Sequence, residues 1–387
     1  MFSSVFEYMK QRKRDNRNKR RKTERHSTYE SAGHAADPLL PPEKLTWSIK
    51  RFKKTELFPH RLIEGDRKPT DAELAQALKI AEGFHYFGHG KVVVIDEDNP
   101  DQIIAIIEFT KVEDLTLSEL NELNIIARFI HKFKQFVNAV NEASRSWGGY
   151  MWMVGWRKGF EAYQLAGVYL NSKKIEAAKD DYNSLMRSSS TPSNILGKLF
   201  KGVANIAFEK NRELMKMNSI PAFGSLHYKD PLNKFECSPN LSFTTGGYFN
   251  PPHKDTKDAQ DFAFALFLPT NKSDGSIIAS TDVYHVKGGS FVFPNYRIGI
   301  NLDEQKGIVK LVWASRTVRH CTLPARESPT QARTAMSLQI NQTTLTTFRD
   351  INNGSIYNRP AIKKKAKENL FVAGHDYAIN PSNYPHP

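Results

Sequence analysis

The amino-acid sequence predicts an α+β protein: a double-stranded β-helix, or jelly roll, with an N-terminal helical support region. Two observations lead to this prediction. After Thr116, apolar residues recur every three or four positions, which is the period of one helix face. After Pro221, short β-branched and aromatic runs bounded by Gly, Pro, Asn and Asp follow one another without helical stretches between them. Such a series of strands favours two packed sheets of the cupin type.

Composition and spacing divide the chain into four expected segments. These are a disordered basic arm at 1–45, a mixed hairpin and helical region packing on the core at 46–220, the β-helix core at 221–350, and a C-terminal tail at 351–387. The length of 387 residues is enough for a substantial core.

The positive charge of the chain is concentrated in the arm. Residues 10–25 contain ten Lys or Arg and two acidic residues, whereas the whole chain carries a net charge of +14. A block of this kind buries little apolar surface and is typical of nuclear import or of attraction to phosphate backbones. A nuclear location and a DNA partner are therefore expected. A solvated arm that only adds solubility is the alternative.

The cysteine content and the hydropathy exclude two further classes of partner. Cys237 and Cys321 are too few for a disulfide framework, so no disulfide-linked partner is expected. The chain has no run of eighteen apolar residues, so we expect no membrane partner.

Local patterns predict the elements of the N-terminal half. We expect a helix over 72–82, a β-hairpin from 91–95 and 103–107, and a long helix that begins at the capping box Thr116–Glu119 and ends near Trp147. Two more helices are expected over 159–186 and 194–217, with 188–192 as the loop between them. The strands expected in the second half span 262–268, 289–293, 307–313 and 333–340.

Three side chains in the second half have the chemistry of a metal site. His253 and Asp255 are two residues apart in an extended stretch, so both project to the same side. His320 comes 65 residues after Asp255, at the start of a short strand. Two histidines and one carboxylate make up the facial triad of non-haem Fe(II) oxygenases, which leaves positions open for a cosubstrate and O₂.

A cation is needed for 2-oxoglutarate, the usual cosubstrate of such iron centres. Arg333 stands at the start of a late strand, and guanidinium binds a carboxylate in a bidentate manner. Arg326 is the rival, although it lies in a loop where a long cation is usually solvated. Tyr248 and Asn240 are expected to reach the keto-acid end of the cosubstrate from a neighbouring strand.

At these residues the chain resembles the Fe(II)/2-oxoglutarate dioxygenases. It is most similar to the TET-like dioxygenase domains of large fungal families, and more distantly to the TET and J-binding-protein group. The motifs that carry this resemblance are Phe-Asn-Pro-Pro-His-Lys-Asp, Gly-Gly-Ser-Phe-Val-Phe-Pro, His-Cys-Thr and Arg-Thr-Ala-Met-Ser-Leu-Gln-Ile-Asn. The resemblance implies that His253, Asp255 and His320 bind Fe(II) and that Arg333 holds the distal carboxylate of 2-oxoglutarate.

The same resemblance implies a methylated pyrimidine in nucleic acid, 5-methylcytosine or thymine, as the substrate. Where animal TET proteins have a base-reading Asn, this chain has Asp258. Gln339 and Asn341 replace the aromatic and histidine residues that hold the base. Two alternatives stay open: the same chemistry on a protein or small molecule, and a vestigial, mobile-element-associated binding module.

Overall fold

The computed structural model describes residues 44–51, 55–63, 67–140, 145–303 and 305–379. The basic run at 10–25 lies outside these ranges, as do nearly all of the expected arm and the last eight residues of the tail. Within the described ranges, no helix is both long enough and apolar enough to cross a membrane.

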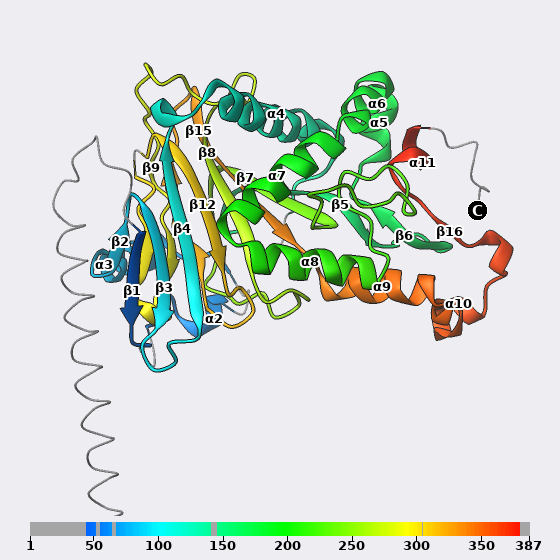
Figure 1. The fold of residues 1–387 in the computed structure, drawn as a ribbon, viewed down its shortest axis with the longest axis horizontal. Coiled ribbons are helices and arrows are strands. Elements are labelled where there is room, and N and C mark those ends of the chain that lie inside the picture. The colour runs from blue at the N-terminus through cyan, green and yellow to red at the C-terminus, as the bar shows by residue number, and fades with distance from the viewer. Residues whose placement is uncertain (1–43, 52–54, 64–66, 141–144, 304, 380–387) are drawn as a thin grey trace, which may run out of the picture.

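A ten-stranded sheet forms the centre of the molecule (Figure 1). In order across the sheet, its strands are β1 (Lys44–Ile49), β3 (Lys91–Asp96), β4 (Ile103–Lys111), β12 (Gly307–Trp313), β8 (Ala263–Asn271), β15 (Gln331–Gln339), β7 (Asn240–Phe249), β5 (Gly148–Lys158), β6 (Gln164–Val168) and β16 (Phe371–Val372). Strands from before residue 220 flank those from after it on both sides. The boundary expected at 220/221 therefore runs through one continuous sheet.

A second sheet packs on one face of the first. It consists of β13 (Cys321–Thr322), β10 (Phe291–Phe293), β11 (Ile298–Ile300) and β2 (His85–Phe87), and a separate pair is formed by β14 (Ala325–Arg326) and β9 (Lys287–Gly288). Both faces of the central sheet are covered, so alternate residues of β8 enter different cores. Ala265 and Phe267 face the second sheet, whereas Phe264 and Leu266 face the helices. The two packed sheets confirm the jelly-roll expectation.

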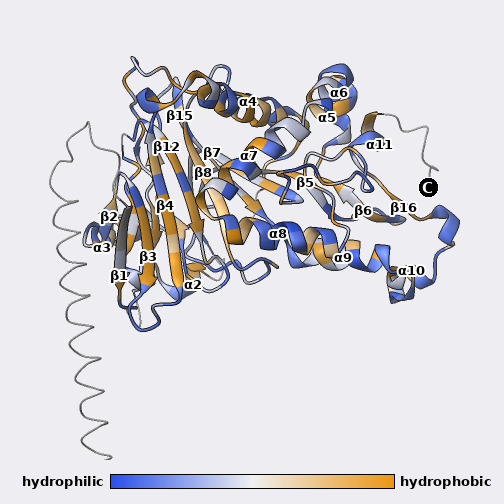
Figure 2. Ribbon diagram, viewed as in Figure 1, coloured by the Kyte–Doolittle hydropathy of each residue, from blue (hydrophilic) through white to orange (hydrophobic). Residues whose placement is uncertain are grey.

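Helices cover the opposite face of the central sheet (Figure 1). The helices of the described ranges are α2 (His60–Ile63), α3 (Asp71–Glu82), α4 (Leu117–Phe133), α5 (Ser172–Ala177), α6 (Lys179–Arg187), α7 (Ser190–Val203), α8 (Asn205–Met217), α9 (Gln342–Asn352), α10 (Pro360–Lys363) and α11 (His375–Ile379). Of these, α4, α6, α7 and α8 pack on that face, whereas α2 and α3 pack against the second sheet. Figure 2 shows that the central strands are predominantly hydrophobic while the helices carry hydrophilic residues as well. The expected capping box is present, because Thr116 and Glu119 bond each other's backbone N–H at the start of α4.

Four expectations for 117–217 are wrong. The helix expected over 194–217 is two helices, α7 and α8, because Ala204 between them is not helical. The helix after Thr116 ends at Phe133, and 148–158 form strand β5. Apolar residues lie on both faces of β5, because Trp152 and Val154 pack in the core on the helix side while Met151 and Met153 line a cavity on the other side. The strand therefore lacks the alternation that marks a half-exposed strand. The region 159–186 contains strand β6 and two short helices instead of one helix, and the expected loop at 188–192 continues into α7. Ser189 supports that junction, because its hydroxyl bonds the carbonyls of Met186 and Gly224.

The described part of the tail is built into the fold as a C-terminal strap, defined here as residues 364–379. Its strand β16 pairs with β6 in parallel, and His375 is fully buried. Nδ1 of His375 lies 2.6 Å from the hydroxyl of Tyr182. The strap therefore closes the edge of the central sheet beside the β5–β6 hairpin.

Candidate active site

Main-chain geometry brings the two expected histidines together. Gly246 and Gly247, both with φ near +70°, bend the end of β7 and direct the chain toward His253. His320 follows the turn after β12. The backbone N–H of each histidine donates to the carbonyl of the other, at 2.9 Å in both directions. Asp255 is fixed in the same way, since its N–H donates to Ser315 O at 3.0 Å.

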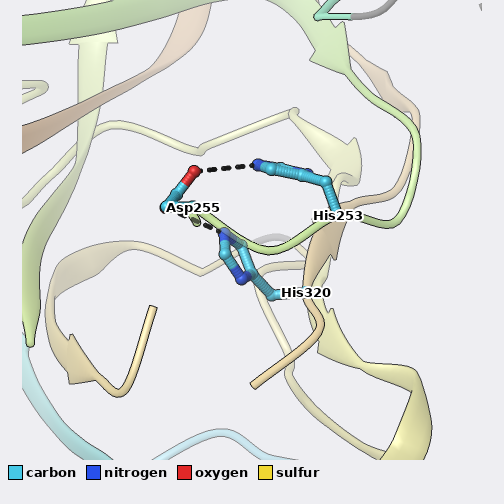
Figure 3. Close-up of side chains that lie close together, drawn as sticks. All are labelled: His253, Asp255 and His320. Atoms are coloured by element: carbon cyan, nitrogen blue, oxygen red, sulfur yellow. Dashed lines mark ion pairs between the residues drawn. The ribbon is translucent and has the colours of Figure 1, made fainter. Parts of the chain in front are cut away.

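The three side chains converge as a metal site requires (Figure 3). Asp255 Oδ1 lies 3.5 Å from His253 Nε2, and Asp255 Oδ2 lies 3.4 Å from His320 Nε2. One ligand atom from each residue lies within 4.8 Å of the others, and no other such group of three occurs among the described residues. His320 is 3% exposed and the Asp255 side chain 15%, so these two side chains lie at the inner end of the cavity, while the His253 side chain is 36% exposed.

Both imidazoles are oriented by backbone carbonyls. His253 Nδ1 lies 2.9 Å from Pro251 O, and His320 Nδ1 lies 3.0 Å from Val318 O. Nδ1–H donation to these oxygens turns each Nε2 toward Asp255, where a protonated Nε2 bonds the carboxylate and a deprotonated Nε2 can bind a metal. The indole nitrogen of Trp313 is also 3.3 Å from His320 Nδ1, but a protonated Nδ1 cannot accept, so we assign the closer carbonyl as the partner.

The charges of the three groups are coupled. Burial alone would raise the pKa of the Asp255 carboxyl, but hydrogen bonds from His253 and His320 outweigh it and hold this pKa well below its usual range. Burial, together with the charge of His253, lowers the pKa of His320. An ionised carboxylate beside a neutral imidazole is the state in which these side chains bind a metal.

The triad opens into a cavity of about 610 Å³. Its inner wall is apolar and comes from both sheets, with Phe267 and Phe291 among the lining residues. Phe291 stacks on His320, with ring centroids 5.4 Å apart. The cations that line the cavity are Arg145, Arg157, Lys158, Lys254 and Lys257, and all but Arg157 are exposed. We call these five residues the basic rim.

Asn240 and Tyr248 both line the cavity, from opposite ends of β7. Asn240 is 2% exposed, and its Nδ2 donates to Trp156 O while its Oδ1 has no partner within the described chain. The Tyr248 hydroxyl donates to Arg145 O at 2.7 Å. The Oδ1 of Asn240 is therefore a buried acceptor, without a partner among the described residues, that can bond a ligand.

Arg333 lies on the cavity side of β15 but does not line the cavity. Its guanidinium is buried and donates to the carbonyls of Gly288, at 2.6 Å, and Leu302. Burial lowers the pKa of Arg333, while Tyr284 and Glu327 oppose this shift. Arg326, the rival, is exposed on β14.

The three residues expected to read the substrate all line the cavity. Gln339 Nε2 lies 3.4 Å from Asp255 Oδ2, so Gln339 contacts the triad itself. Asn341 caps α9 through its Oδ1, which accepts from the N–H of Thr343 at 2.8 Å. Asp258 is 6% exposed, and burial together with the charge of Asp255 raises its pKa to about 8.

Arg157 and Phe160 are among the cavity residues that sequence reasoning missed. Both lie at the β5–β6 hairpin, at or beside a stretch that was expected to be helical. Gly159, which precedes the aromatic residue, was the available signal for a turn. The free Cys321 beside His320 is 1% exposed, and burial raises the pKa of its thiol to about 12.

The donor set fits ferrous iron. Two imidazole nitrogens and one carboxylate oxygen converge on one point. The Nδ1 atom of each imidazole is held by a backbone carbonyl. The cavity beside them has room for a small keto acid and a second molecule. These features agree with an iron centre that binds a cosubstrate.

Comparison with known proteins identifies the family. The family model described as "Tet-like 2OG-Fe(II) oxygenase superfamily" matches residues 116–325, more than half of the chain, and includes all three residues of the triad. Comparison with curated proteins gives no match. Among solved structures, an oxidoreductase of the 2OG-Fe(II) oxygenase family from Burkholderia pseudomallei is 11% identical with a TM-score of 0.30, and the match covers 62% of this chain and 85% of that chain. On the family match, the chain belongs to the Tet-like 2OG-Fe(II) oxygenase superfamily and is an Fe(II)/2-oxoglutarate-dependent dioxygenase that takes O₂ as cosubstrate.

Proposed function

We propose that this protein oxidises a methylated pyrimidine, 5-methylcytosine or thymine, in nucleic acid. The observation that carries the proposal is the cavity, which has the His–Asp–His triad at its inner end and the basic rim around it. Phosphate groups attract such cations in a salt-dependent way. A base within a duplex would have to be flipped out of the stack to reach the triad.

In this proposal His253, Asp255 and His320 hold the iron. Iron with bound 2-oxoglutarate and O₂ supplies the oxidising chemistry. The chain holds its ligands by backbone hydrogen bonds to Pro251 O and Val318 O, so their geometry is set before any ligand arrives. The apolar wall beside His320 keeps water away from the reacting methyl group.

Arg333 is proposed to bind the distal carboxylate of 2-oxoglutarate. It projects from the same face of β15 as Ala335 and Ser337, which line the cavity. Its guanidinium is already desolvated, and a carboxylate would be a stronger partner than the neutral carbonyls that it bonds. Binding would therefore require at least one carbonyl of Gly288 or Leu302 to be exchanged for the ligand.

The target base is proposed to lie near Asp258, Gln339 and Asn341. Asn240 is paired with Gln339 across β7 and β15, six residues along β15 from Arg333. That position suits the substrate end of the cavity better than the cosubstrate end where the sequence suggested Asn240. Its unpaired Oδ1 can accept a hydrogen bond from the exocyclic amine of cytosine.

We further propose a nuclear location, with the basic run at 10–25 as the import or DNA-attachment signal. Imaging a fluorescent fusion with and without that run tests this part by itself. Nuclear exclusion of the full chain would contradict it.

Mass spectrometry of nucleosides tests the substrate proposal. Methylated DNA is incubated with protein, Fe(II), ascorbate and 2-oxoglutarate, and an oxidised pyrimidine is expected. The product should disappear with His253→Ala and persist with His227→Ala, a histidine outside the cavity. If 2-oxoglutarate is consumed while neither DNA nor RNA yields an oxidised base, the substrate lies in another chemical class.

A further inference from the structure

The turn between β5 and β6 presents an aromatic ring to solvent in a fixed position. Phe160 is 80% exposed and lines the cavity. Its backbone N–H donates to Gln164 Oε1 at 3.1 Å, and the preceding Gly159 N–H donates to Leu165 O at 3.1 Å. One exposed apolar side chain is ordinary on a protein surface. This ring differs from an ordinary exposed side chain because the residues behind it hold it in place.

Phe160 rests on a guanidinium that is itself fixed. Arg157 Cζ lies 3.8 Å from the centroid of the Phe160 ring and 5.8 Å from that of Tyr169. Arg157 also donates to Val168 O at 3.1 Å and to Lys158 O at 3.0 Å, so it cannot easily swing away. The cation therefore supports one face of the phenyl ring. The large exposed fraction leaves the rest of the ring to water.

The C-terminal strap braces this hairpin from the other edge. Phe371 and Val372 pair with Gln164 and Ala166 of β6, and Lys365 Nζ bonds Ala162 O within the turn. Figure 1 shows β6 between β5 and β16 at one end of the central sheet. A ring braced in this way loses little conformational freedom when a partner stacks on it.

The charges that line the cavity beside the ring indicate what the partner is, although the exposed Glu161 also adjoins Phe160 in the turn. Phe160 and the basic rim line the same cavity, whereas the acidic residues among the described lining residues are Asp255 and Asp258, which are both mostly or fully buried. A flat aromatic face next to exposed cations is the combination that binds single-stranded nucleic acid: the cations follow the phosphates and the ring stacks on a base.

We propose that Phe160, supported by Arg157 and Tyr169, is a stacking platform for an unpaired nucleobase that neighbours the target nucleotide. This inference rests on the proposed nucleic-acid function and adds to it the residue that fixes the strand at the mouth of the cavity. Stacking is sequence-tolerant, because every base has a π-face. The platform would therefore contribute affinity for unpaired strands and little base preference.

Binding to the metal-free full chain tests the platform independently of catalysis. The probe is a short single-stranded DNA that contains 2-aminopurine, whose fluorescence falls on stacking; anisotropy gives the affinity. Phe160→Ala should weaken binding roughly tenfold, as expected for one lost base stack, and restore the probe's fluorescence. Phe160→Trp should keep both signals. Ile206→Ala, which removes a 74% exposed apolar side chain on α8 outside the cavity, is the matched control.

The outcomes separate this inference from the proposed function. Wild-type affinity and quenching in Phe160→Ala would overturn the platform, even if the protein oxidises bases. Lack of strand binding by the wild-type chain would also overturn it. A third outcome is that Phe160→Ala loses strand binding while Ile206→Ala keeps it, and the iron-loaded wild-type enzyme yields no oxidised base. That outcome would support the platform and contradict the proposed function.

Discussion

The inner end and the mouth of the cavity are built by different means. At the inner end, His253, Asp255 and His320 are held by main-chain hydrogen bonds between segments that follow β7 and β12. At the mouth, Arg157 and Phe160 belong to a hairpin at the far side of the sheet, and most rim cations are exposed. The three triad side chains are thus positioned by backbone contacts between strand ends, whereas Arg157 and Phe160 at the mouth project from a hairpin.

A substitution in the triad should produce the largest difference between the effect on turnover and the effect on strand binding. Asp255→Ala is expected to reduce 2-oxoglutarate turnover on the order of a hundredfold or more, because the iron loses an anionic ligand. Strand binding should stay at the wild-type level, since the rim is untouched. Succinate production and anisotropy measure the two effects. Asp261→Ala, at an exposed carboxylate six residues further on, is the control. If Asp255→Ala lost strand binding as severely as it lost turnover, the two regions would not be separate.

Gln339 sharpens the comparison because it lines the cavity and its side-chain amide contacts Asp255 of the triad. Gln339→Leu should weaken Fe(II) affinity about tenfold, since the carboxylate loses a hydrogen-bond donor that orients it. Gln342→Leu, where the amide contacts only Thr346 among the described residues, should not. Competition between the protein and a fluorescent chelator gives the affinity. Wild-type affinity in Gln339→Leu would restrict that residue to a substrate role.

Acid should destabilise the fold through protonation of His375 in the C-terminal strap. Burial lowers the pKa of His375 to about 3 from its ordinary 6.5, so between these values the unfolded chain takes up a proton that the folded chain does not. Stability should therefore fall as the pH falls below 6.5, by about 1.4 kcal/mol per pH unit from this group. Urea unfolding over a pH series should show a flatter slope for His375→Asn than for the wild type. Equal slopes would mean that His375 is protonated in the fold.

The smallest effects are expected at the exposed cations of the rim. Lys254→Ala or Lys257→Ala should weaken strand binding a few-fold and reduce the dependence of log affinity on log salt by about 0.7 each. Lys198→Ala, at a cation on α7 that pairs with Glu122, is the control. Anisotropy at several salt concentrations measures the slope. If the slope of log affinity against log salt stayed unchanged in both variants, these lysines would not contact the phosphates of the strand.

The sequence predicted the triad at the inner end of the cavity but not the hairpin residues at its mouth, for physical reasons. The spacing of His253 and Asp255 is local, and His320 comes seven residues after the end of a strand that could be recognised, so short patterns were enough. The orientation of Arg333 depends on carbonyls from Gly288 and Leu302, which a linear pattern does not display. Strand β5, and with it the hairpin that carries Phe160, was missed because apolar residues lie on both faces of the strand.

Anaerobic titration with Fe(II) tests the central claim most directly. The wild-type chain should bind one Fe(II), and 2-oxoglutarate should tighten that binding, because the triad leaves positions open for a chelating keto acid. His320→Ala should lose the site, while His131→Ala, at a helical histidine outside the cavity, should keep it. Retention of stoichiometric, oxoglutarate-sensitive iron by His320→Ala would show that the three converging side chains are not the iron centre.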